Sequence, residues 1–277
     1  MEKGDVPVTE TQNRLVTQSL LEAILRDLGV APGGDVMVHA ALSRLGHIVN
    51  GARDVIDALA AVIGADGTIL VPAHANLTDP ALWRKPPVPE DWVAVIRAEM
   101  KPFDPHLTPV FRRGALPDAL LRHPATRRSP HPQAAVAALG AKAEWYTASH
   151  PLHQGHGADS PYNRLRLAGG QVLLMGVGLE SCTVLHLAEC LAECPYTRQQ
   201  PVAVLQVDGS GHRSFVRLQS YGGSSAHFEK LRPVFAGRGW LREHHLDDYL
   251  FTLLDVGPAL DWLIERLRTE PDYLSTP

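Results

Sequence analysis

Cysteine is scarce in this sequence. Cys182, Cys190 and Cys194 are the three cysteines among 277 residues. They lie close together, and their spacing matches neither a disulfide framework nor a paired zinc knuckle. We therefore expect three reduced thiols, and the sequence excludes a small secreted scaffold stapled by disulfides.

Long apolar runs and an excess of positive charge are missing too. No stretch approaches the roughly 18 apolar residues that span a bilayer, and the opening MEKGDVPVTETQN has no apolar signal-peptide core. We expect a soluble, cytoplasmic protein. Lys and Arg total 26 against 30 Asp and Glu, a formal net charge of -4. Such a chain has no basic excess for a phosphate backbone, so we expect no nucleic-acid partner.

Apolar periodicity and turn residues predict alternating strands and helices. A first helix is expected after Thr9, because Leu15, Leu21 and Leu25 recur at helical spacing, and it should end before Gly29. Further helices are predicted at residues 54–63, 90–100, 142–147, 181–194 and 255–268, and one more at Ser160-Pro161. Strands are predicted at residues 35–40, 68–71, 133–139 and 171–178, with a hairpin at 202–208 and 212–219. Without a repeat or linker, we expect residues 1–277 to form one α/β domain around a mixed sheet.

Polar side chains share one face of the helix predicted after residues 171–178. Thr183, His186 and Glu189 recur at helical spacing, followed by Cys190 and Glu193. A histidine with a carboxylate one turn later is a base with an orienting partner. Amides at the helix start, near Thr183, are suited to holding an oxyanion or a phosphate. A solvated polar face of a structural helix has the same spacing.

Three histidines are clustered in a loop. His150, His153 and His156 could bind zinc. However, Pro151 and the neighbouring glycines oppose the helix that would align them, and no nearby Cys or Glu completes a ligand pattern. We expect a polar loop over a binding cleft, without a metal.

Adjacent arginines precede the strand predicted at residues 133–139. Arg127 and Arg128 with Ser129 can hold a phosphate through charge-assisted hydrogen bonds. Adjacent arginines are more often solvated, and GVAPGGD is a turn rather than a Walker motif. These residues alone leave the choice open.

Taken in order, the segments resemble the aminoglycoside 3-N-acetyltransferase family from about residue 15 to residue 267. The matching blocks are LGVAPGGDVMVHAALSRLG, DGTILVPAH, FDPHLTP, RRSPHP, GADSPYNRL and VLLMGVGLESCTVLHLAE. The resemblance implies a three-layer α/β/α sandwich, distinct from the smaller GNAT fold, with acetyl-coenzyme A as co-substrate and no metal. It also implies antibiotic resistance through transfer of acetyl to the 3-amino group of a 2-deoxystreptamine aminoglycoside, by a monomer or homodimer.

The resemblance also implies roles for individual residues. His186 matches the catalytic base, Glu189 its acidic partner, and Thr183 the hydroxyl residue that faces the thioester. Coenzyme-binding positions are His39, Ala40, Ala41, Ser43, Arg128, Ser129 and Thr183. Acceptor-binding positions are Asp79, His156, Glu180 and Glu189.

Two departures from the family pattern affect binding. Ala40 and Ala41 replace serines, so backbone amides would have to contact the coenzyme. His153 and His156 replace an acidic residue and aromatics, which changes the charge offered to the acceptor.

Three alternatives remain beside direct transfer. Cys182, at the predicted helix start, could carry a covalent route, which implies ping-pong kinetics. The acceptor could be another small amine. A non-catalytic ligand-binding protein could also keep this fold, although intact His186 and Glu189 oppose that alternative.

Overall fold

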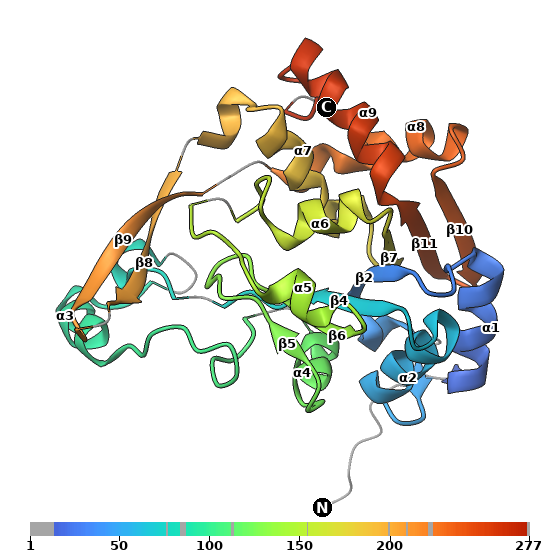
Figure 1. The fold of residues 1–277 in the computed structure, drawn as a ribbon, viewed down its shortest axis with the longest axis horizontal. Helices are drawn as coiled ribbons and strands as arrows, with labels where there is room; N and C mark the ends of the chain where they lie inside the picture. The colour runs from blue at the N-terminus through green and yellow to red at the C-terminus, as the bar shows by residue number, and fades with distance from the viewer. Residues whose placement is uncertain are drawn as a thin grey trace, which may run out of the picture.

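A seven-stranded mixed sheet forms the centre of the protein, in the order β10-β11-β7-β2-β4-β6-β5 (Figure 1). The computed structural model describes residues 14–75, 77–83, 87–111, 114–153, 155–198, 200–208, 210–220 and 224–275. The strands of the sheet are β2 (Asp35–Ala40), β4 (Thr68–Pro72), β5 (Arg127–Arg128), β6 (Val136–Gly140), β7 (Gln171–Met175), β10 (Leu241–Leu246) and β11 (Tyr249–Asp255). Strand β2 runs parallel to β4 and β7, and the other neighbours pair antiparallel.

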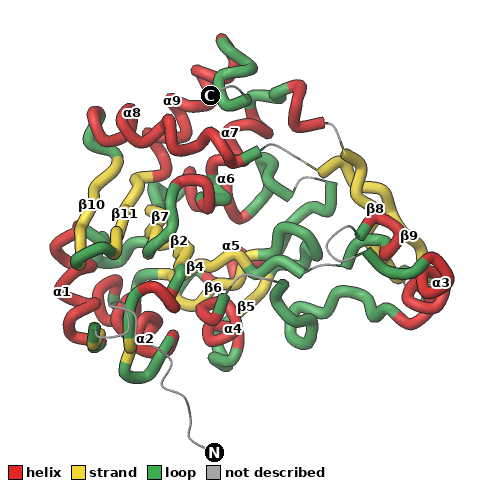
Figure 2. The backbone as a smooth tube through the Cα atoms, turned by 180° about the vertical axis from the view of Figure 1, so that it is seen from behind, coloured by secondary structure: helices red, strands yellow, loops and turns green. Residues whose placement is uncertain are grey.

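Helices cover both faces of this sheet, as Figures 1 and 2 show from opposite sides. One face carries α1 (Gln18–Leu28), α2 (Ala52–Ile63) and α4 (Ala115–Leu121). The other carries α5 (Ala143–Thr147), α6 (Pro161–Leu167), α7 (Leu185–Leu191), α8 (Arg232–Gly237) and α9 (Val256–Thr269). Because successive strand side chains point to opposite faces, Met37 packs in one core and Val36 and Val38 in the other. The predicted α/β/α sandwich is confirmed.

A separate arm projects from the sheet at one side of the molecule (Figures 1 and 2). It contains the antiparallel hairpin of β8 (Gln200–Val207) and β9 (Arg213–Ser220), together with α3 (Glu90–Glu99). The Arg213 guanidinium donates to the Arg97 carbonyl over 3.1 Å and so joins hairpin and helix. Both predicted elements, the hairpin and the 90–100 helix, are confirmed.

The first helix begins later than the sequence pattern predicts. Thr17 caps α1 by accepting a hydrogen bond from the Leu20 amide. The residues before it, Leu15–Val16, form strand β1 and pair with β3 (His47–Ile48). The helical assignment of Leu15 was wrong because that segment is held in a strand, and Thr9 lies outside the described residues. At the other end, Gly29 closes the helix in a left-handed conformation, φ 89°.

The helix that was expected over residues 181–194 is also shorter than predicted. Helix α7 spans Leu185–Leu191, and Thr183 lies in the turn before it. Glu193 has φ 55°, a left-handed conformation that ends the helix. The sequence suggested that free amides at the start of a helix would lie near Thr183. Because α7 begins at Leu185, the helix start lies two residues after Thr183.

Other predicted elements agree with the structure to within a few residues. Ser160 caps α6 with Pro161 in its first turn, and α2, α5 and α9 coincide with predicted helices. Within the described segments, no helix combines the length and the apolar character needed to cross a membrane.

Candidate active site

A cavity of about 540 Å³ opens at the carboxyl ends of the three parallel strands. Residues from the end of β2 and residues just after β4 and β7 line it, and a turn before α7 closes one side. Its lining is Val38, His39, Ala40, Pro72, His74, Gly114, Leu116, Pro117, Gln133, His156, Val177, Glu180, Ser181, Thr183, His186 and Ser225. Ligand sites in α/β sheets favour this edge, because the loops there are free to vary around fixed strands. The fold thus brings six of the predicted site residues together: His39, Ala40, His156, Glu180, Thr183 and His186.

His186 and Glu189 form a hydrogen-bonded pair at the wall of the cavity. Nδ1 of His186 lies 2.6 Å from Oε2 of Glu189, whose side chain is fully buried. Since a carboxylate only accepts, Nδ1 carries the proton and Nε2 is left for the cavity. The Tyr196 hydroxyl donates to the other carboxylate oxygen over 3.0 Å. The buried charge is therefore hydrogen-bonded at both oxygens, as burial of a carboxylate requires.

Aromatic rings surround His186. The Phe228 ring centre lies 5.0 Å and the His156 ring centre 5.7 Å from that of His186. His156 stacks on Tyr162 at 4.8 Å, and the Tyr162 hydroxyl in turn lies 3.0 Å from Nε2 of His74. These contacts fix one wall of the cavity and limit the rotation of the His186 ring.

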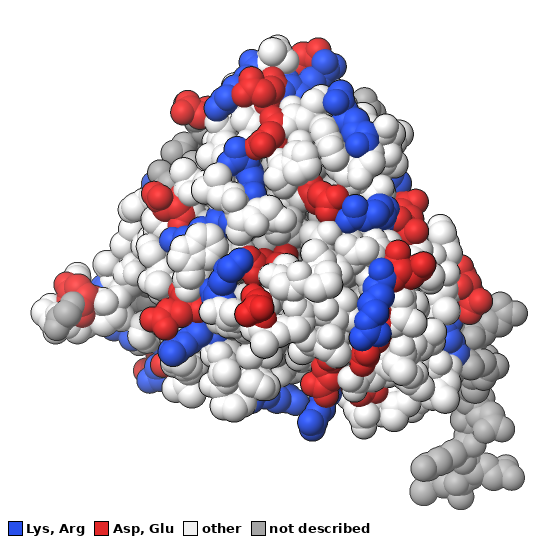
Figure 3. All heavy atoms as spheres, turned by 45° about the vertical axis from the view of Figure 1, so that its right-hand side comes forward, with Lys and Arg blue, Asp and Glu red and all other residues white. Residues whose placement is uncertain are grey.

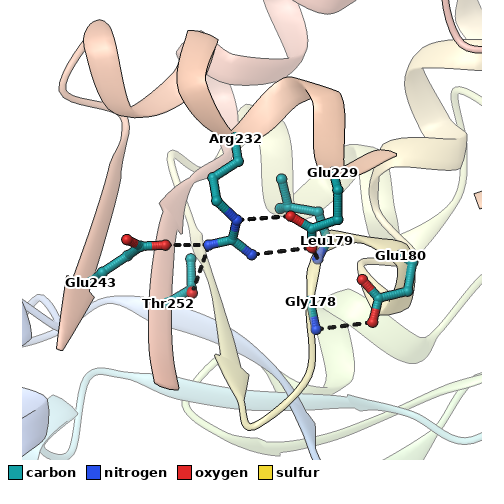
Figure 4. A network of polar contacts seen from close by, with 7 residues as sticks. All are labelled: Gly178, Leu179, Glu180, Glu229, Arg232, Glu243 and Thr252. Carbon is teal, nitrogen blue, oxygen red and sulfur yellow. Dashed lines mark hydrogen bonds and ion pairs between the residues drawn. The ribbon is translucent and has the colours of Figure 1, made fainter. Parts of the chain in front are cut away.

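A charged network holds the turn that carries Glu180 (Figure 4). Oε1 of Glu180 accepts from the Gly178 amide over 3.0 Å, and Oε1 of Glu229 accepts from the Leu179 amide over 2.5 Å. A Cβ at Gly178 would come within 2.2 Å of an oxygen of each carboxylate, so a larger residue there would displace the Glu180 and Glu229 side chains. The two carboxylates therefore converge on the same side of Gly178.

Arg232 neutralises the Glu229 side of this network. Its guanidinium binds Glu229 at 2.7 Å and also contacts Glu243, and it donates to Oγ1 of Thr252 over 3.3 Å (Figure 4). Burial raises the pKa of Glu229, but its hydrogen bonds to Arg232 and to the Leu179 amide lower it by more, so the net shift is downward. Glu180, which is exposed and lines the cavity, is left as the carboxylate available to a cationic ligand.

Arg128 and Ser129 are placed away from the cavity lining. The Arg128 guanidinium is buried, donates to the carbonyls of Ala73 and Thr108, and lies 4.8 Å from the Phe103 ring centre. Burial lowers its pKa to about 10. Oγ of Ser129 accepts from the Val136 amide at 2.9 Å and lies 2.9 Å from His150. Both side chains hold loops together here, and their coenzyme-binding role remains a prediction without support from these contacts.

Four further predicted positions lie outside the lining, among them Glu189, a predicted acceptor contact whose side chain is fully buried. The Asp79 carboxylate binds the Arg97 guanidinium at 2.8 and 2.9 Å and accepts from the Ala81 amide. Burial raises the pKa of Asp79, but these bonds lower it by more. The Ala41 amide, which was expected to substitute for a missing hydroxyl, donates to the Met175 carbonyl over 2.9 Å. Ser43 is exposed. The contacts of Asp79 and Ala41 are therefore made within the protein.

Cys182 is not a thiolate at a helix start. Its side chain is buried in the core, and it precedes α7 by three positions. Burial raises the pKa of the thiol to about 12, so the group is protonated at neutral pH. The structure thus opposes the premise of a covalent route through this residue.

The histidine loop has the geometry of a structural cluster. Nδ1 of His150 faces Ser129 and Nε2 lies 2.8 Å from the Gly155 carbonyl, so both ring nitrogens have partners. The His131 ring centre is 4.6 Å away, and burial lowers the pKa of His131 to about 4 and of His150 to about 3. Over the described parts of the chain, no group of three His, Cys, Asp or Glu residues is arranged to hold a metal.

Several lining residues were not identified from the sequence. His74 follows the predicted strand at residues 68–71, Gln133 lies beside the histidine loop, and Ser225 begins the 3₁₀ turn η6 (Ser225–Leu231). His74 carried one usable signal, since it stands just beyond the end of a parallel strand. Ser225 carried none, because it is about 40 residues away from His186 in the sequence and reaches the cavity through tertiary packing.

Acidic and basic side chains are interspersed over the face shown in Figure 3, where neither sign forms a continuous patch. On that face, a charged ligand is therefore attracted by individual side chains and not by a continuous patch of one sign.

Comparison with known proteins places this geometry in a family. A sequence model of the family described as "Aminoglycoside 3-N-acetyltransferase" matches residues 37–268. Aminoglycoside N(3)-acetyltransferase IX of Micromonospora chalcea is 35% identical over 280 residues, which cover 91% of this chain and 95% of the relative.

Solved structures agree with that assignment. The chain is similar to AAC-IIIb in a binary complex with CoASH, with a TM-score of 0.81, 33% identity, and coverage of 92% of this chain and 97% of the other. It is also similar to a variant of aminoglycoside acetyltransferase AAC(3)-IVa in complex with gentamicin, with a TM-score of 0.82, 27% identity, and coverage of 97% and 94%. The chain therefore belongs to the aminoglycoside 3-N-acetyltransferase family, which confirms the acetyltransferase class that its motifs predicted.

Proposed function

We propose that this protein transfers acetyl from acetyl-coenzyme A to the 3-amino group of a 2-deoxystreptamine aminoglycoside and thereby protects its host from such antibiotics. The names of its relatives support the reaction, since they are aminoglycoside N(3)-acetyltransferases. The relatives seen with CoASH and with gentamicin support the donor and the acceptor class.

The observation that carries the mechanism is the His186–Glu189 pair at the cavity wall. With Nδ1 bound to Glu189 at 2.6 Å, Nε2 is the nitrogen positioned to accept a proton from the attacking amine. Glu189 holds the ring and stabilises the imidazolium that forms. A positioned base contributes on the order of 10² to 10⁴ in rate, and alignment of both substrates supplies much of the remainder.

The transfer is direct, within a ternary complex. The amine nitrogen forms a bond to the thioester carbonyl carbon, and its proton passes to Nε2 of His186. Collapse of the tetrahedral intermediate breaks the carbon–sulfur bond, and the coenzyme thiolate leaves and takes up the proton. Thr183, which lines the cavity beside His186, faces the thioester in this arrangement.

The two substrates occupy opposite parts of the cavity. His39 and Ala40 at the end of β2 lie on the coenzyme side, as the motif comparison predicts. Glu180 and His156 lie on the acceptor side, where the exposed carboxylate of Glu180 attracts a cationic amine.

A thiol-release assay with acetyl-coenzyme A and gentamicin-like, kanamycin-like and apramycin-like acceptors tests the proposal, and NMR of the product identifies the acetylated nitrogen. We expect release with at least one acceptor and acetyl at the 3-amino group. Acetylation at another amine would refute the regiochemistry and keep the enzyme class. If a different small amine releases coenzyme A and none of the aminoglycosides does, the proposed acceptor is wrong and that amine takes its place.

A further inference from the structure

Tyr196, beyond the end of α7, contacts the carboxylate that orients His186. Its hydroxyl donates to Oε1 of Glu189 over 3.0 Å, while Oε2 of Glu189 is 2.6 Å from Nδ1 of His186. The hydroxyl, carboxylate and imidazole form one hydrogen-bonded chain that ends at the cavity. Tyr196 itself is not part of the cavity lining.

The backbone fixes Tyr196 relative to Glu189. After α7 the chain reverses through Glu193, and the Cys194 amide donates to the Glu189 carbonyl over 3.1 Å. Tyr196 follows in the 3₁₀ turn η5 (Pro195–Arg198). Buried Thr197 closes this turn with a 2.6 Å bond to the Cys194 carbonyl. The turn is thus tied to the backbone of the same residue whose carboxylate the tyrosine contacts.

Burial keeps the Tyr196 hydroxyl protonated, so that it remains a hydrogen-bond donor. Burial and the nearby Glu189 charge raise the pKa of Tyr196, so its proton stays in place throughout the working pH range. The Glu189 side chain is fully buried, and a buried carboxylate depends on protein donors to stay ionised and in place.

We propose that Tyr196 is a positioning residue: its hydroxyl holds the Glu189 carboxylate in the orientation that keeps Nδ1 of His186 protonated and Nε2 directed to the cavity. This inference rests on the proposed role of His186 as the base. Tyr196 lies outside the helix predicted at residues 181–194. It adds a third residue to the His186–Glu189 pair, which the sequence motif identified.

Other titratable groups near the pair belong to separate elements. His156 lies 5.7 Å from His186 between ring centres, and Glu180 faces the same cavity. On the Tyr196 side is the thiol of Cys194, whose pKa burial raises. The Tyr196 hydroxyl is also hydrogen-bonded to that thiol and lowers its pKa, so removing the hydroxyl raises the pKa of Cys194 further from neutral pH. A shift of the acid limb in that variant therefore reports on the chain from Tyr196 to His186.

The test is Tyr196→Phe, with Tyr146→Phe as the matched control. The Tyr146 hydroxyl also donates to a buried carboxylate, Oδ2 of Asp35 at 2.8 Å, but neither residue lines the cavity. We expect Tyr196→Phe to lower kcat about tenfold at unchanged KM, the effect of one hydrogen bond to a charged group. Without the donor, the Glu189 charge acts more strongly on His186, so the acid limb of kcat/KM against pH should move to higher pH.

A measurement without turnover separates this proposal from the proposed function. In ¹⁵N-labelled protein, the His186 Nδ1 proton should change its chemical shift in Tyr196→Phe and keep it in Tyr146→Phe. An unchanged resonance in both variants overturns the proposal, as does a kcat loss no larger than in the control or a loss without a shift of the acid limb. Full turnover in His186→Asn would instead refute the base assignment, whatever the tyrosine variants show.

Discussion

The Nδ1 atom of His186 and the Oε2 atom of Glu189 are 2.6 Å apart, in a helix of seven residues whose other face is part of the apolar core. The spacing of three residues places both side chains on one helical face. Burial of Glu189 and partial exposure of His186 suit the two residues to different tasks in the proposed mechanism. There the carboxylate orients the ring, and the ring meets the substrate.

Loss of the base should reduce the rate of reaction while substrate binding is retained. His186→Asn is expected to lower kcat by roughly 10² or more, because proton removal from the amine loses its acceptor. Steady-state kinetics combined with calorimetric titration of both substrates checks this. His153→Asn, on the exposed part of the histidine loop, is the control. Normal binding with turnover within about threefold of wild type would rule out the assignment.

Removal of the Cys182 thiol should leave the reaction intact. The thiol is buried and its pKa is raised to about 12, so it is not a nucleophile at neutral pH. Cys182→Ala is expected to keep kcat within about threefold of wild type, with a loss of thermal stability from the small core cavity. Initial-rate lines should intersect when both substrates are varied. Parallel lines together with an inactive variant would support the covalent route instead.

Acceptor binding should depend on Glu180 and on salt. Glu180→Gln is expected to raise KM for the aminoglycoside about fivefold, close to 1 kcal/mol, and to leave KM for acetyl-coenzyme A unchanged. KM for the acceptor should rise with ionic strength in the wild type, and less so in the variant. Asp57→Asn removes one charge from α2 outside the cavity and serves as the control. Equal effects of the two substitutions would argue against a local contact.

Mild acid should destabilise the fold through the buried histidines. The pKa values of His131 and His150 are lowered by burial to about 4 and about 3, against about 6.5 in an unfolded chain. Below about pH 6.5 the unfolded chain binds more protons, so stability falls as pH decreases, by up to about 1.4 kcal/mol per pH unit for each group. Urea unfolding at pH 7, 6 and 5 measures this slope. A stability that is flat over that window would show that these histidines are not buried in neutral form.

Chelation should affect neither activity nor stability. In the described segments the histidine loop is held by Ser129 and backbone carbonyls, and its rings are not arranged as metal ligands. Dialysis against a strong chelator is expected to leave turnover and melting temperature unchanged. Stoichiometric zinc in active protein, found by elemental analysis, would point to a metal-assisted reaction.

Strong local signals made much of the fold predictable. The buried strands β2 and β7 were predicted from continuous apolar runs, and α6 from Ser160 and Pro161, because a cap and a proline fix a helix start locally. Strands β10 and β11 were both missed. β10 lies at the sheet edge, and its sequence LREHHL has no apolar run, since only one face of an edge strand is covered. β11 lies inside the sheet and does contain an apolar run, YLFTLLD, which was not assigned to a strand.

By itself, the sequence identified the pair that we propose carries the chemistry. His186 and Glu189 are three positions apart, and helical geometry alone brings such a pair into contact. Only the tertiary structure decided what surrounds them. Tyr196 reaches Glu189 through a chain reversal, and Glu229 and Ser225 reach the site through packing of the η6 turn against the turn at Leu179–Ser181. The tertiary structure also decided that Arg128 and Asp79 bind partners within the protein. A charged group that is removed from water must be paired or hydrogen-bonded.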